Sequence, residues 1–246
     1  MKVKDAVALV TGASRGIGKQ FVLSLHKAGA ARIYIGVRDP EKVAEIVSIN
    51  TEKIIPIQLD ITNEKLVRDA AAHCQDLTLL INNAGILLNK GLIAAPNLAS
   101  ARTEMEVNYF GTLSMCRAFA PILKTNGGGV IVNVLSILAR INFPPEGSYS
   151  ASKAAALSLT QGVRAELAPQ GTQVIAVMPG RVDTDMTKNE TVAKVSPSLV
   201  VAATLQAVLD GVEEVYPDDE ARSLVAQLTS DPKAVEKWMA TMLPTS

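Results

Sequence analysis

The sequence has few cysteines, few histidines and no excess of either charge, and each shortage excludes a class of protein. Among its 246 residues only two are cysteines, Cys74 and Cys116, and these lie in separate segments with no partnered spacing. They predict reduced, buried thiols of a cytoplasmic protein rather than a disulfide framework. The 24 basic residues equal the 24 acidic residues in number and are scattered, so no nucleic-acid-binding surface is expected.

Long hydrophobic runs are also missing. The apolar run that ends before Thr11 is too short for the core of a signal peptide, and no stretch approaches the ~20 apolar residues of a membrane span. We therefore expect no membrane partner. The two histidines are His26 and His73, and the pair His73-Cys74 has no third or fourth ligand at metal spacing. No metal site is predicted.

The chain does contain a regular alternation of short apolar runs and segments with helical periodicity. Most of the runs are continuous rather than alternating, as in strands that are buried on both faces. The alternation predicts an α/β fold, a doubly wound parallel sheet with helices on both faces, in a single domain 1–246. Predicted strands are Ala6–Thr11, Ile33–Val37, Ile54–Leu59, Leu77–Asn82, Val130–Val134 and Gln173–Met178, and predicted helices are Lys19–Ala28, Lys65–Cys74, Arg102–Leu123 and Ala151–Leu167. Residues 201–246 are expected to add helices and a short strand near Glu213–Tyr216.

A glycine-rich loop, TGASRGIG at Thr11–Gly18, follows the first predicted strand. It is not a Walker A loop, because Ala13 replaces the first glycine of that motif and Gln20 replaces its magnesium-binding hydroxyl. It matches the nucleophile elbow of hydrolases around Ser14, but that site needs a later histidine and none follows His73. The remaining alternatives are a dinucleotide-binding turn and a merely glycine-rich turn.

The end of the second predicted strand bears on which dinucleotide would bind. An acidic residue there favours NAD, whereas an arginine accommodates the 2′-phosphate of NADP. Val37 stands where the acid would be and Arg38 follows it, while Arg15 of the glycine loop is placed to reach the same phosphate. We therefore predict NADPH/NADP. Asp39 keeps NAD open as the alternative, and two solvated surface arginines are the other interpretation.

Further motifs follow in a definite order. Asn83-Ala84-Gly85 ends the fourth predicted strand, and Tyr149 and Lys153 lie four residues apart in YSASK. With the glycine loop, Asn108 and Ser136, this set resembles the short-chain dehydrogenase/reductase family from about Lys4 to Met186. The resemblance implies a Rossmann-type fold that binds NAD(P), with Asn108, Ser136, Tyr149 and Lys153 as catalytic residues. Together with the strand-end argument, it implies cofactor contacts at Gly12, Ser14, Arg15, Gly16, Ile17, Gly18, Arg38, Asp60, Ile61, Asn83, Ala84, Gly85, Tyr149, Lys153, Pro179, Gly180, Val182 and Thr184.

The spacing of Tyr149 and Lys153 has a chemical reason. Residues four apart share one face of a helix, and a free tyrosine has a pKa of ~10. An ammonium group nearby is predicted to lower that pKa, so that Tyr149 acts as a general acid toward a carbonyl oxygen. Ser136 would hydrogen-bond the same oxygen. The resemblance adds that Lys153 holds the nicotinamide ribose and that Asn108 anchors a water in a proton relay.

The predicted function is an NADPH-dependent oxidoreductase that reduces a ketone or aldehyde to an alcohol, reversibly. A 3-oxoacyl thioester reductase of the same family is the first alternative. A non-catalytic NADP(H)-sensing regulator is the second, which the intact Ser, Tyr and Lys set disfavours. The expected substrate is a small, mostly apolar carbonyl compound, because the expected lining is apolar. That lining comprises Ile86, Leu87, Leu88, Ile137, Leu138, Phe143 and a substrate lid at 184–200, with Glu146 facing substrate or water.

Two departures from the family pattern concern packing and assembly. Leu135-Ser136 replaces the usual serine pair, and EEVYPD at Glu213–Asp218 stands where a strand ending in Asp-Gly-Gly is common. A homodimer or homotetramer is nevertheless expected, because the helices that hold Asn108 and Tyr149 carry more apolar residues than one sheet face needs. These residues are Met105, Leu113, Phe119, Leu157 and Leu159.

Overall fold

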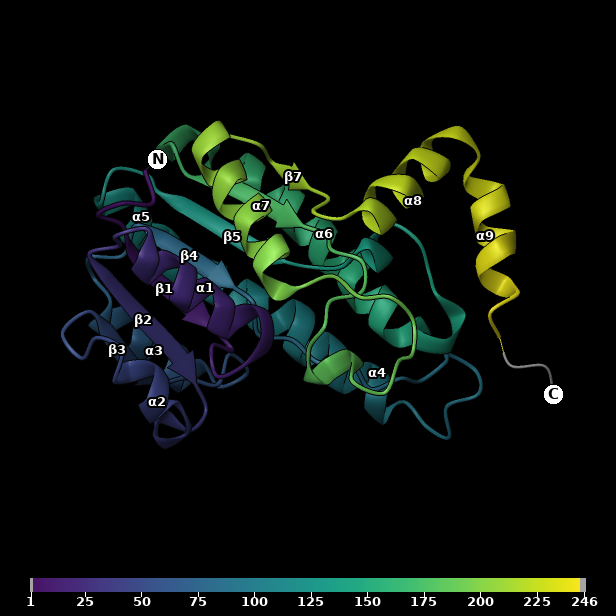
Figure 1. Ribbon diagram of the computed structural model, residues 1–246, viewed down its shortest axis with the longest axis horizontal. Helices are drawn as coiled ribbons and strands as arrows, with labels where there is room; N and C mark the ends of the chain where they lie inside the picture. The colour runs from purple at the N-terminus through teal and green to yellow at the C-terminus, as the bar shows by residue number, and fades with distance from the viewer. Residues whose placement is uncertain (1, 244–246) are drawn as a thin grey trace.

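Seven parallel strands form one sheet in the computed structural model, which describes residues 2–243 (Figure 1). They are β1 Val7–Thr11, β2 Arg32–Val37, β3 Ile54–Gln58, β4 Leu79–Asn82, β5 Val130–Val134, β6 Gln173–Val177 and β7 Glu214–Val215. Each strand overlaps one of the strands predicted from the sequence. The α/β, Rossmann-type fold class is confirmed, although the predicted domain 1–246 extends beyond the described residues at both ends.

The strand order β3-β2-β1-β4-β5-β6-β7 places the start of the chain at the centre of the sheet. Val10 of β1 pairs with Ile35 of β2 on one side and with Ile81 of β4 on the other. The chain therefore runs outward to β3 and then crosses back to β4. Where the order reverses, the loops beyond the carboxyl ends of neighbouring strands diverge and leave a crevice, which is where open α/β sheets bind ligands.

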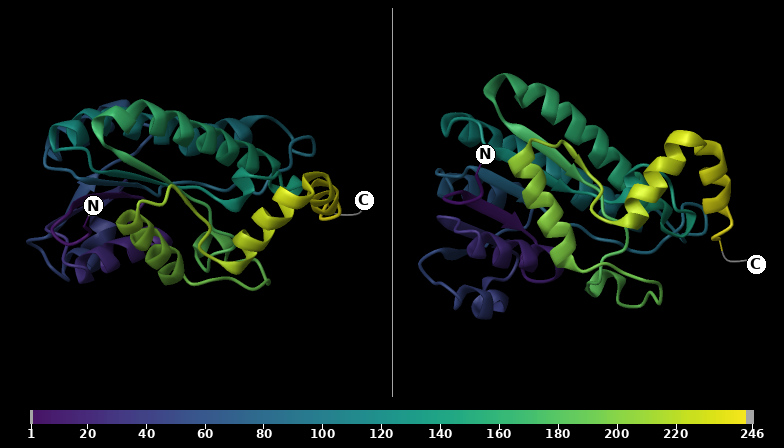
Figure 2. Two further views of the ribbon diagram at one scale, coloured as in Figure 1. Left: turned by 90° about the horizontal axis from the view of Figure 1, so that it is seen from above. Right: turned by 45° about the horizontal axis from the view of Figure 1, so that its top comes forward.

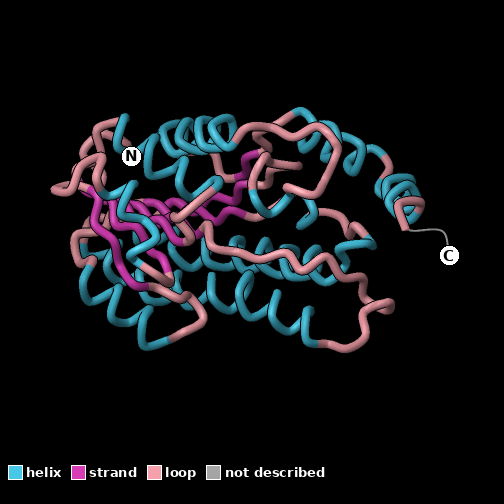
Figure 3. The backbone as a smooth tube through the Cα atoms, turned by 60° about the horizontal axis from the view of Figure 1, so that its bottom comes forward, coloured by secondary structure: helices cyan, strands magenta, loops and turns pink. Residues whose placement is uncertain are grey.

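Helices cover both faces of the sheet, and Figures 2 and 3 show the three layers. One face is covered by α1 Gly16–Lys27, α2 Ala44–Val47 and α7 Pro197–Asp210, and the other by α3 Glu64–His73, α4 Ala99–Met105, α5 Thr112–Thr125 and α6 Gly147–Leu167. Successive strand residues point to opposite faces. Val10 packs in the cluster with Phe21 of α1, whereas Leu9 packs in the cluster with Phe119 of α5. Both faces are buried, which explains why the runs are continuous in sequence.

The C-terminal helices α8 Asp219–Ser230 and α9 Pro232–Ala240 project beyond one end of the sheet (Figures 1 and 2). Asp218 caps α8 by accepting a hydrogen bond from the backbone N–H of Ala221 at 2.9 Å. These helices form a small hydrophobic cluster with Ile137, which follows β5, and their own residues in it are Ala221, Leu224, Val235 and Met239. Within residues 2–243, no helix has the length and apolar character needed to cross a bilayer.

The predicted helix Arg102–Leu123 is interrupted. A π-helical segment, Glu106–Gly111, separates α4 from α5 and carries Asn108. Such single wide turns inside α-helices are rare and occur frequently at functional sites. Hydrophobic periodicity does not report them, because the apolar stripe continues on both sides.

The burial of the helix residues corrects the premise used for assembly. Phe119, Leu157 and Leu159 are at most 8% exposed, so they belong to the core of the chain itself. The expectation that these three are surplus apolar surface was wrong, because they pack inside the chain, whereas Met105 and Leu113 are half-buried. The two cysteines are free and buried, as expected.

Candidate active site

A cavity of about 860 Å³ opens at the carboxyl ends of the strands, at the point where the strand order reverses. It collects nearly all the residues that the sequence selected. Those that line it are Gly12, Ser14, Arg15, Gly16, Ile17, Arg38, Asp60, Ile61, Asn83, Ala84, Gly85, Ser136, Tyr149, Lys153, Pro179, Gly180, Val182 and Thr184. Gly18 and Asn108 lie behind this wall and support it.

The glycine loop is shaped by close backbone contacts. Gly12 has a φ of +65°, and a Cβ there would lie 2.9 Å from the Cα of Ala84. A Cβ on Gly18 would lie 2.3 Å from the carbonyl oxygen of Gly12. The Asn83 side chain fixes the loop by donating hydrogen bonds to the carbonyl oxygens of Thr11 at 3.0 Å and Gly12 at 3.2 Å. Only glycine fits these two positions.

The start of α1 fits a phosphate group. Its N-cap residue, Arg15, makes no side-chain cap hydrogen bond, and the first turn contains no acidic residue. The first N–H groups of the helix therefore point into the cavity mouth without a side-chain acceptor, at the positive end of the helix dipole. Together with the glycine cradle, this is the environment that a dinucleotide pyrophosphate requires.

At the opposite end of the cavity, Arg38 and Asp39 are the two candidates for contact with the ribose, and their side chains have different surroundings. Arg38 lines the cavity and is exposed. The Asp39 carboxylate instead accepts from the backbone N–H of Glu41 at 3.2 Å and pairs with Lys42 at 3.3 Å, so it is occupied locally. Arg15 also lines the cavity and pairs with Asp185 at 3.1 Å, and both of these side chains are more than 60% exposed. Such an exposed pair is weak and exchanges readily.

The reactive groups lie at the inner end of the cavity. Helix α6 begins at Gly147, and it carries Tyr149 and Lys153 one turn apart with both side chains buried. The Lys153 ammonium lies 5.6 Å from the centre of the Tyr149 ring and donates a hydrogen bond to the Val134 carbonyl oxygen at 3.1 Å. Ser136, which follows β5, accepts from the Leu138 N–H at 3.1 Å. The end of β5 and the start of α6 thus bring the three residues together.

Asn108 does not line the cavity but holds its wall. Its side-chain oxygen accepts from the Ile86 N–H at 2.9 Å, and its amide donates to the Ile86 carbonyl at 3.0 Å and to the Ser152 hydroxyl at 2.9 Å. The π-helical turn brings this amide against the loop after β4. The structure thus shows Asn108 fixing the position of Ile86, while its predicted role in a proton relay stays a prediction.

Comparison with known proteins agrees with this geometry. The family model described as short chain dehydrogenase matches residues 6–194. This chain belongs to the short-chain dehydrogenase/reductase family. A short chain dehydrogenase of Monascus purpureus is 36% identical over 200 residues, which span 76% of this chain and 68% of that protein. The crystal structure of a short chain dehydrogenase from Burkholderia cenocepacia J2315 in complex with NADP superposes with a TM-score of 0.93, at 44% identity, over 99% of this chain and 100% of that one.

One chemical expectation for this short-chain dehydrogenase was wrong. Lys153 was expected to lower the pKa of Tyr149, but burial raises the pKa of the phenol well above its ordinary value. The Glu146 carboxylate adds to the rise, and a hydrogen bond with Ser136 opposes it. Burial also lowers the pKa of Lys153 to about 8, because the charged ammonium loses its hydration. Tyr149 is therefore held in its protonated form, which is the form that can donate a proton.

The inner end of the short-chain dehydrogenase cavity, where the carbonyl compound is expected to bind (the carbonyl end), is largely apolar, as predicted. Ile86, Leu87, Ile137, Leu138 and Phe143 line it, whereas Leu88 does not and is 38% exposed. From the predicted lid, the residues that line the cavity are Thr184, Asp185, Met186, Thr187, Glu190 and Val192. Three apolar residues near the C-terminus also line the cavity, namely Trp238 and Met239 of α9 and Met242, which follows that helix. Sequence reasoning missed these three because no motif marks them. Their amphipathic spacing in and after α9 was the only signal available.

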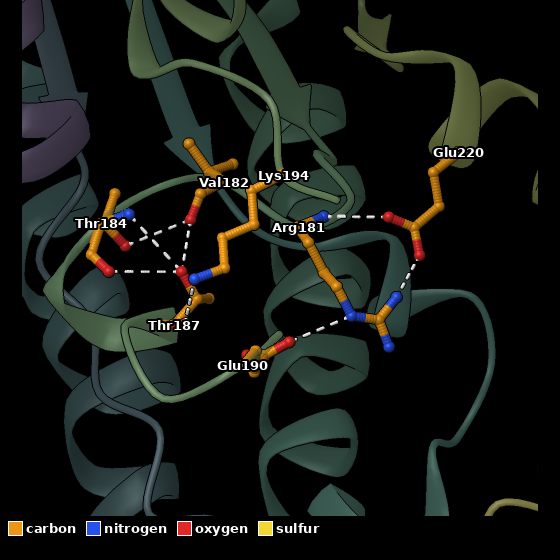
Figure 4. Close-up of polar contacts among 7 residues, drawn as sticks. All are labelled: Arg181, Val182, Thr184, Thr187, Glu190, Lys194 and Glu220. Atoms are coloured by element: carbon orange, nitrogen blue, oxygen red, sulfur yellow. Dashed lines mark hydrogen bonds and ion pairs between the residues drawn. The ribbon is translucent and has the colours of Figure 1, made fainter. Parts of the chain in front are cut away.

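An ionic network around Arg181 was also missed. The Arg181 guanidinium pairs with Glu190 of the lid at 3.0 Å and with Glu220 of α8 (Figure 4). It also lies 5.9 Å from the centre of the Phe143 ring. Beside it, Thr187 donates to the Val182 carbonyl at 2.6 Å and Lys194 donates to the Thr187 carbonyl at 2.6 Å. Arg181 therefore ties the lid to the C-terminal helices across the cavity mouth.

Proposed function

We propose that this short-chain dehydrogenase is an NADPH-dependent reductase that converts a ketone or aldehyde into an alcohol, reversibly. The observation that carries the proposal is that Ser136, Tyr149 and Lys153 line the same cavity as the glycine loop and Arg38. A site that only sensed the dinucleotide has no need of a serine hydroxyl and a buried phenol at its inner end. Family membership and the NADP complex of the Burkholderia cenocepacia relative support the choice of cofactor.

The chain offers groups for each part of an NADP molecule. The α1 N-terminus and the glycine loop suit the pyrophosphate, Arg38 suits the 2′-phosphate, and Asp60 lies in the same cavity wall for the adenine. When bound, the reduced nicotinamide supplies a hydride. Pro179, Gly180 and Val182 form the wall beside Ser136, Tyr149 and Lys153, where that ring would lie.

The proton chemistry rests on two hydroxyl groups of the chain. Tyr149 holds its proton, because burial and the Glu146 carboxylate both disfavour the phenolate. A carbonyl oxygen that reaches this phenol can accept the proton from it, and the Ser136 hydroxyl can stabilise the negative charge that develops on the same oxygen. The apolar side chains around them keep the reacting groups away from water. Lys153 is fixed beside the phenol by its bond to Val134.

NADPH oxidation, followed at steady state with a panel of apolar ketones, aldehydes and a 3-oxoacyl thioester, tests the proposal. Reduction of ketones or aldehydes with the highest specificity constants supports it. A strong preference for the thioester would make the protein a 3-oxoacyl thioester reductase instead. NADPH binding without turnover of any of these compounds would favour a sensor of the dinucleotide.

We also propose that the protein assembles as a homodimer or homotetramer. The remaining support is Phe110 in the π-helical segment between α4 and α5, which is 49% exposed and stacks edge-on against Tyr109 at 4.9 Å. An exposed aromatic side chain such as that of Phe110 is typical of a surface that another chain covers. Light scattering at micromolar concentration should give a mass of at least twice 26.0 kDa, and a monomer mass would refute the proposal.

A further inference from the structure

The carbonyl end of the cavity has an uneven charge distribution. Its lining includes the carboxylates of Glu146, Glu190 and Glu220 and the guanidinium of Arg181, beside Asp185, which pairs with Arg15, and Lys153, which donates to the Val134 carbonyl. Glu190 and Glu220 are both paired with Arg181, so these three residues together carry a single negative charge. Carboxylates engage both the Nε and the Nη1 groups of Arg181, so its positive charge is already neutralised within the protein.

Glu146 is the carboxylate that lacks a counter-ion. It is the N-cap residue of α6, yet its side chain makes no cap hydrogen bond. Its backbone is engaged, since its N–H donates to the Phe143 carbonyl at 2.8 Å and its carbonyl accepts from Ser150 at 3.1 Å. Among the described residues its carboxylate has no hydrogen-bond or ion-pair partner, and the residue lines the cavity together with Tyr149. A half-buried carboxylate of this kind is stabilised by any cation that reaches it.

From this arrangement we propose that Glu146 selects the substrate by charge, so that the site takes a carbonyl compound with an apolar body and a cationic group, and rejects a carboxylate. The inference rests on the proposed carbonyl reductase function and names its substrate class. The apolar body would lie against the walls contributed by Ile137, Phe143 and Met239. The cationic group would replace the counter-ion that the protein does not supply to Glu146.

The electrostatics of the surroundings agree with this arrangement. Burial raises the pKa of the Glu146 carboxyl, the neighbouring carboxylates of Glu190 on the lid and Glu104 on α4 add to the rise, and Arg181 opposes it, so that the pKa lies at about 7. Glu146 in turn raises the pKa of Tyr149 on its own helix. The negative charge at position 146 is therefore present above about pH 7 and is lost below it. Charge selection should strengthen as the pH rises through 7.

Three para-substituted acetophenones test the proposal, of which the cationic and the neutral one are matched in shape. Their para substituents are trimethylammoniomethyl, neopentyl and carboxymethyl, and none of the three changes its charge between pH 6 and 8. The expected order of specificity constants with NADPH is cationic, then neutral, then anionic, with at least about a tenfold span between the extremes. In the Glu146→Gln variant the span should shrink toward unity. In the wild type it should grow between pH 6 and 8, and in the variant it should stay constant.

Asp219→Asn is the matched control, because it removes one negative charge from the nearby α8 at a side chain that is fully exposed and paired with Arg222. It should leave the order and the span unchanged. Calorimetric binding of the same three ketones to the NADP-loaded protein separates the two proposals. The charge order in binding without turnover sustains the charge selection and refutes the reductase function. Turnover of all three ketones without that order, or an order that Glu146→Gln leaves intact, overturns the role of Glu146.

Discussion

Replacing Gly18 by alanine adds one methyl group at the tightest contact of the glycine loop. The new Cβ would lie 2.3 Å from the Gly12 carbonyl oxygen, 2.6 Å from the Asn83 amide nitrogen and 3.0 Å from the Ala13 Cα. Two of these three atoms belong to the backbone, so the loop itself must move. Overpacking of this kind destabilises a protein by about 1–3 kcal/mol.

Two smaller effects modify this magnitude. Asn83 donates to Thr11 and Gly12, and displacing it weakens hydrogen bonds that each contribute about 1 kcal/mol. Alanine is the better helix former by about 1 kcal/mol, which offsets that loss. We therefore expect Gly18→Ala to lower the free energy of unfolding by about 1–3 kcal/mol. For a chain of this length this corresponds to a decrease in Tm of about 2–12 °C.

Gly162→Ala is the control, because Gly162 lies within α6 and a Cβ there meets no atom within 4 Å. It should raise the stability by up to about 1 kcal/mol. Thermal unfolding of both variants with and without NADP gives the comparison. Added NADP should raise the Tm of Gly162→Ala as much as that of wild type, and that of Gly18→Ala less. Equal stability of the two variants would show that the loop does not need its close backbone approach.

Three further predictions concern the reactive and cofactor-binding groups. Tyr149→Phe should bind NADPH normally and lose about 10²–10⁴-fold in the single-turnover rate of ketone reduction, and a rate close to wild type would dismiss the phenol as the acid. Arg38→Ala should lower the specificity constant for NADPH by about ten- to a hundredfold and leave that for NADH nearly unchanged, whereas a wild type that prefers NADH would contradict the role of Arg38. Lys153→Met should be inactive, and its stability relative to wild type should be greatest below pH 8. The pKa of Lys153 falls from 10.5 to about 8 on folding, so the unfolded chain binds more protons than the folded chain between these pH values. The free energy of unfolding of wild type should therefore rise relative to that of the variant as the pH increases from 8 to 10. Urea unfolding at several pH values measures this, and a constant difference would show that burial does not disfavour the ammonium.

Much of the fold and of the cofactor end of the site could be predicted from the sequence, because local features determine them. The continuous runs of β-branched residues mark strands buried on both faces, and Gly12 and Asn83 follow such strands directly. The parallel topology then brings the carboxyl ends of the strands to one edge. These steps need only the order and spacing of motifs along the chain.

The remaining features depend on contacts between distant segments. The pKa of Tyr149 follows from its burial and from Glu146, neither of which the four-residue spacing to Lys153 reveals. The ion pairs of Arg181 join residues nine and 39 positions away in sequence. The π-helical turn at Asn108 arises where the helix meets the loop containing Ile86. No local pattern encodes these arrangements.

The hydrophobic cluster under α8 and α9 is small, and Ile137 and its neighbours after β5 join it to the rest of the molecule. The two sheet clusters hold the dinucleotide cradle, whereas the cluster around Leu224 and Val235 supports part of the carbonyl wall. The C-terminal helices can therefore open locally at a free energy below that of global unfolding, and their amide protons should exchange first. The same arrangement means that sequence changes in the last quarter of the chain can alter the range of accepted compounds while the redox machinery is inherited unchanged.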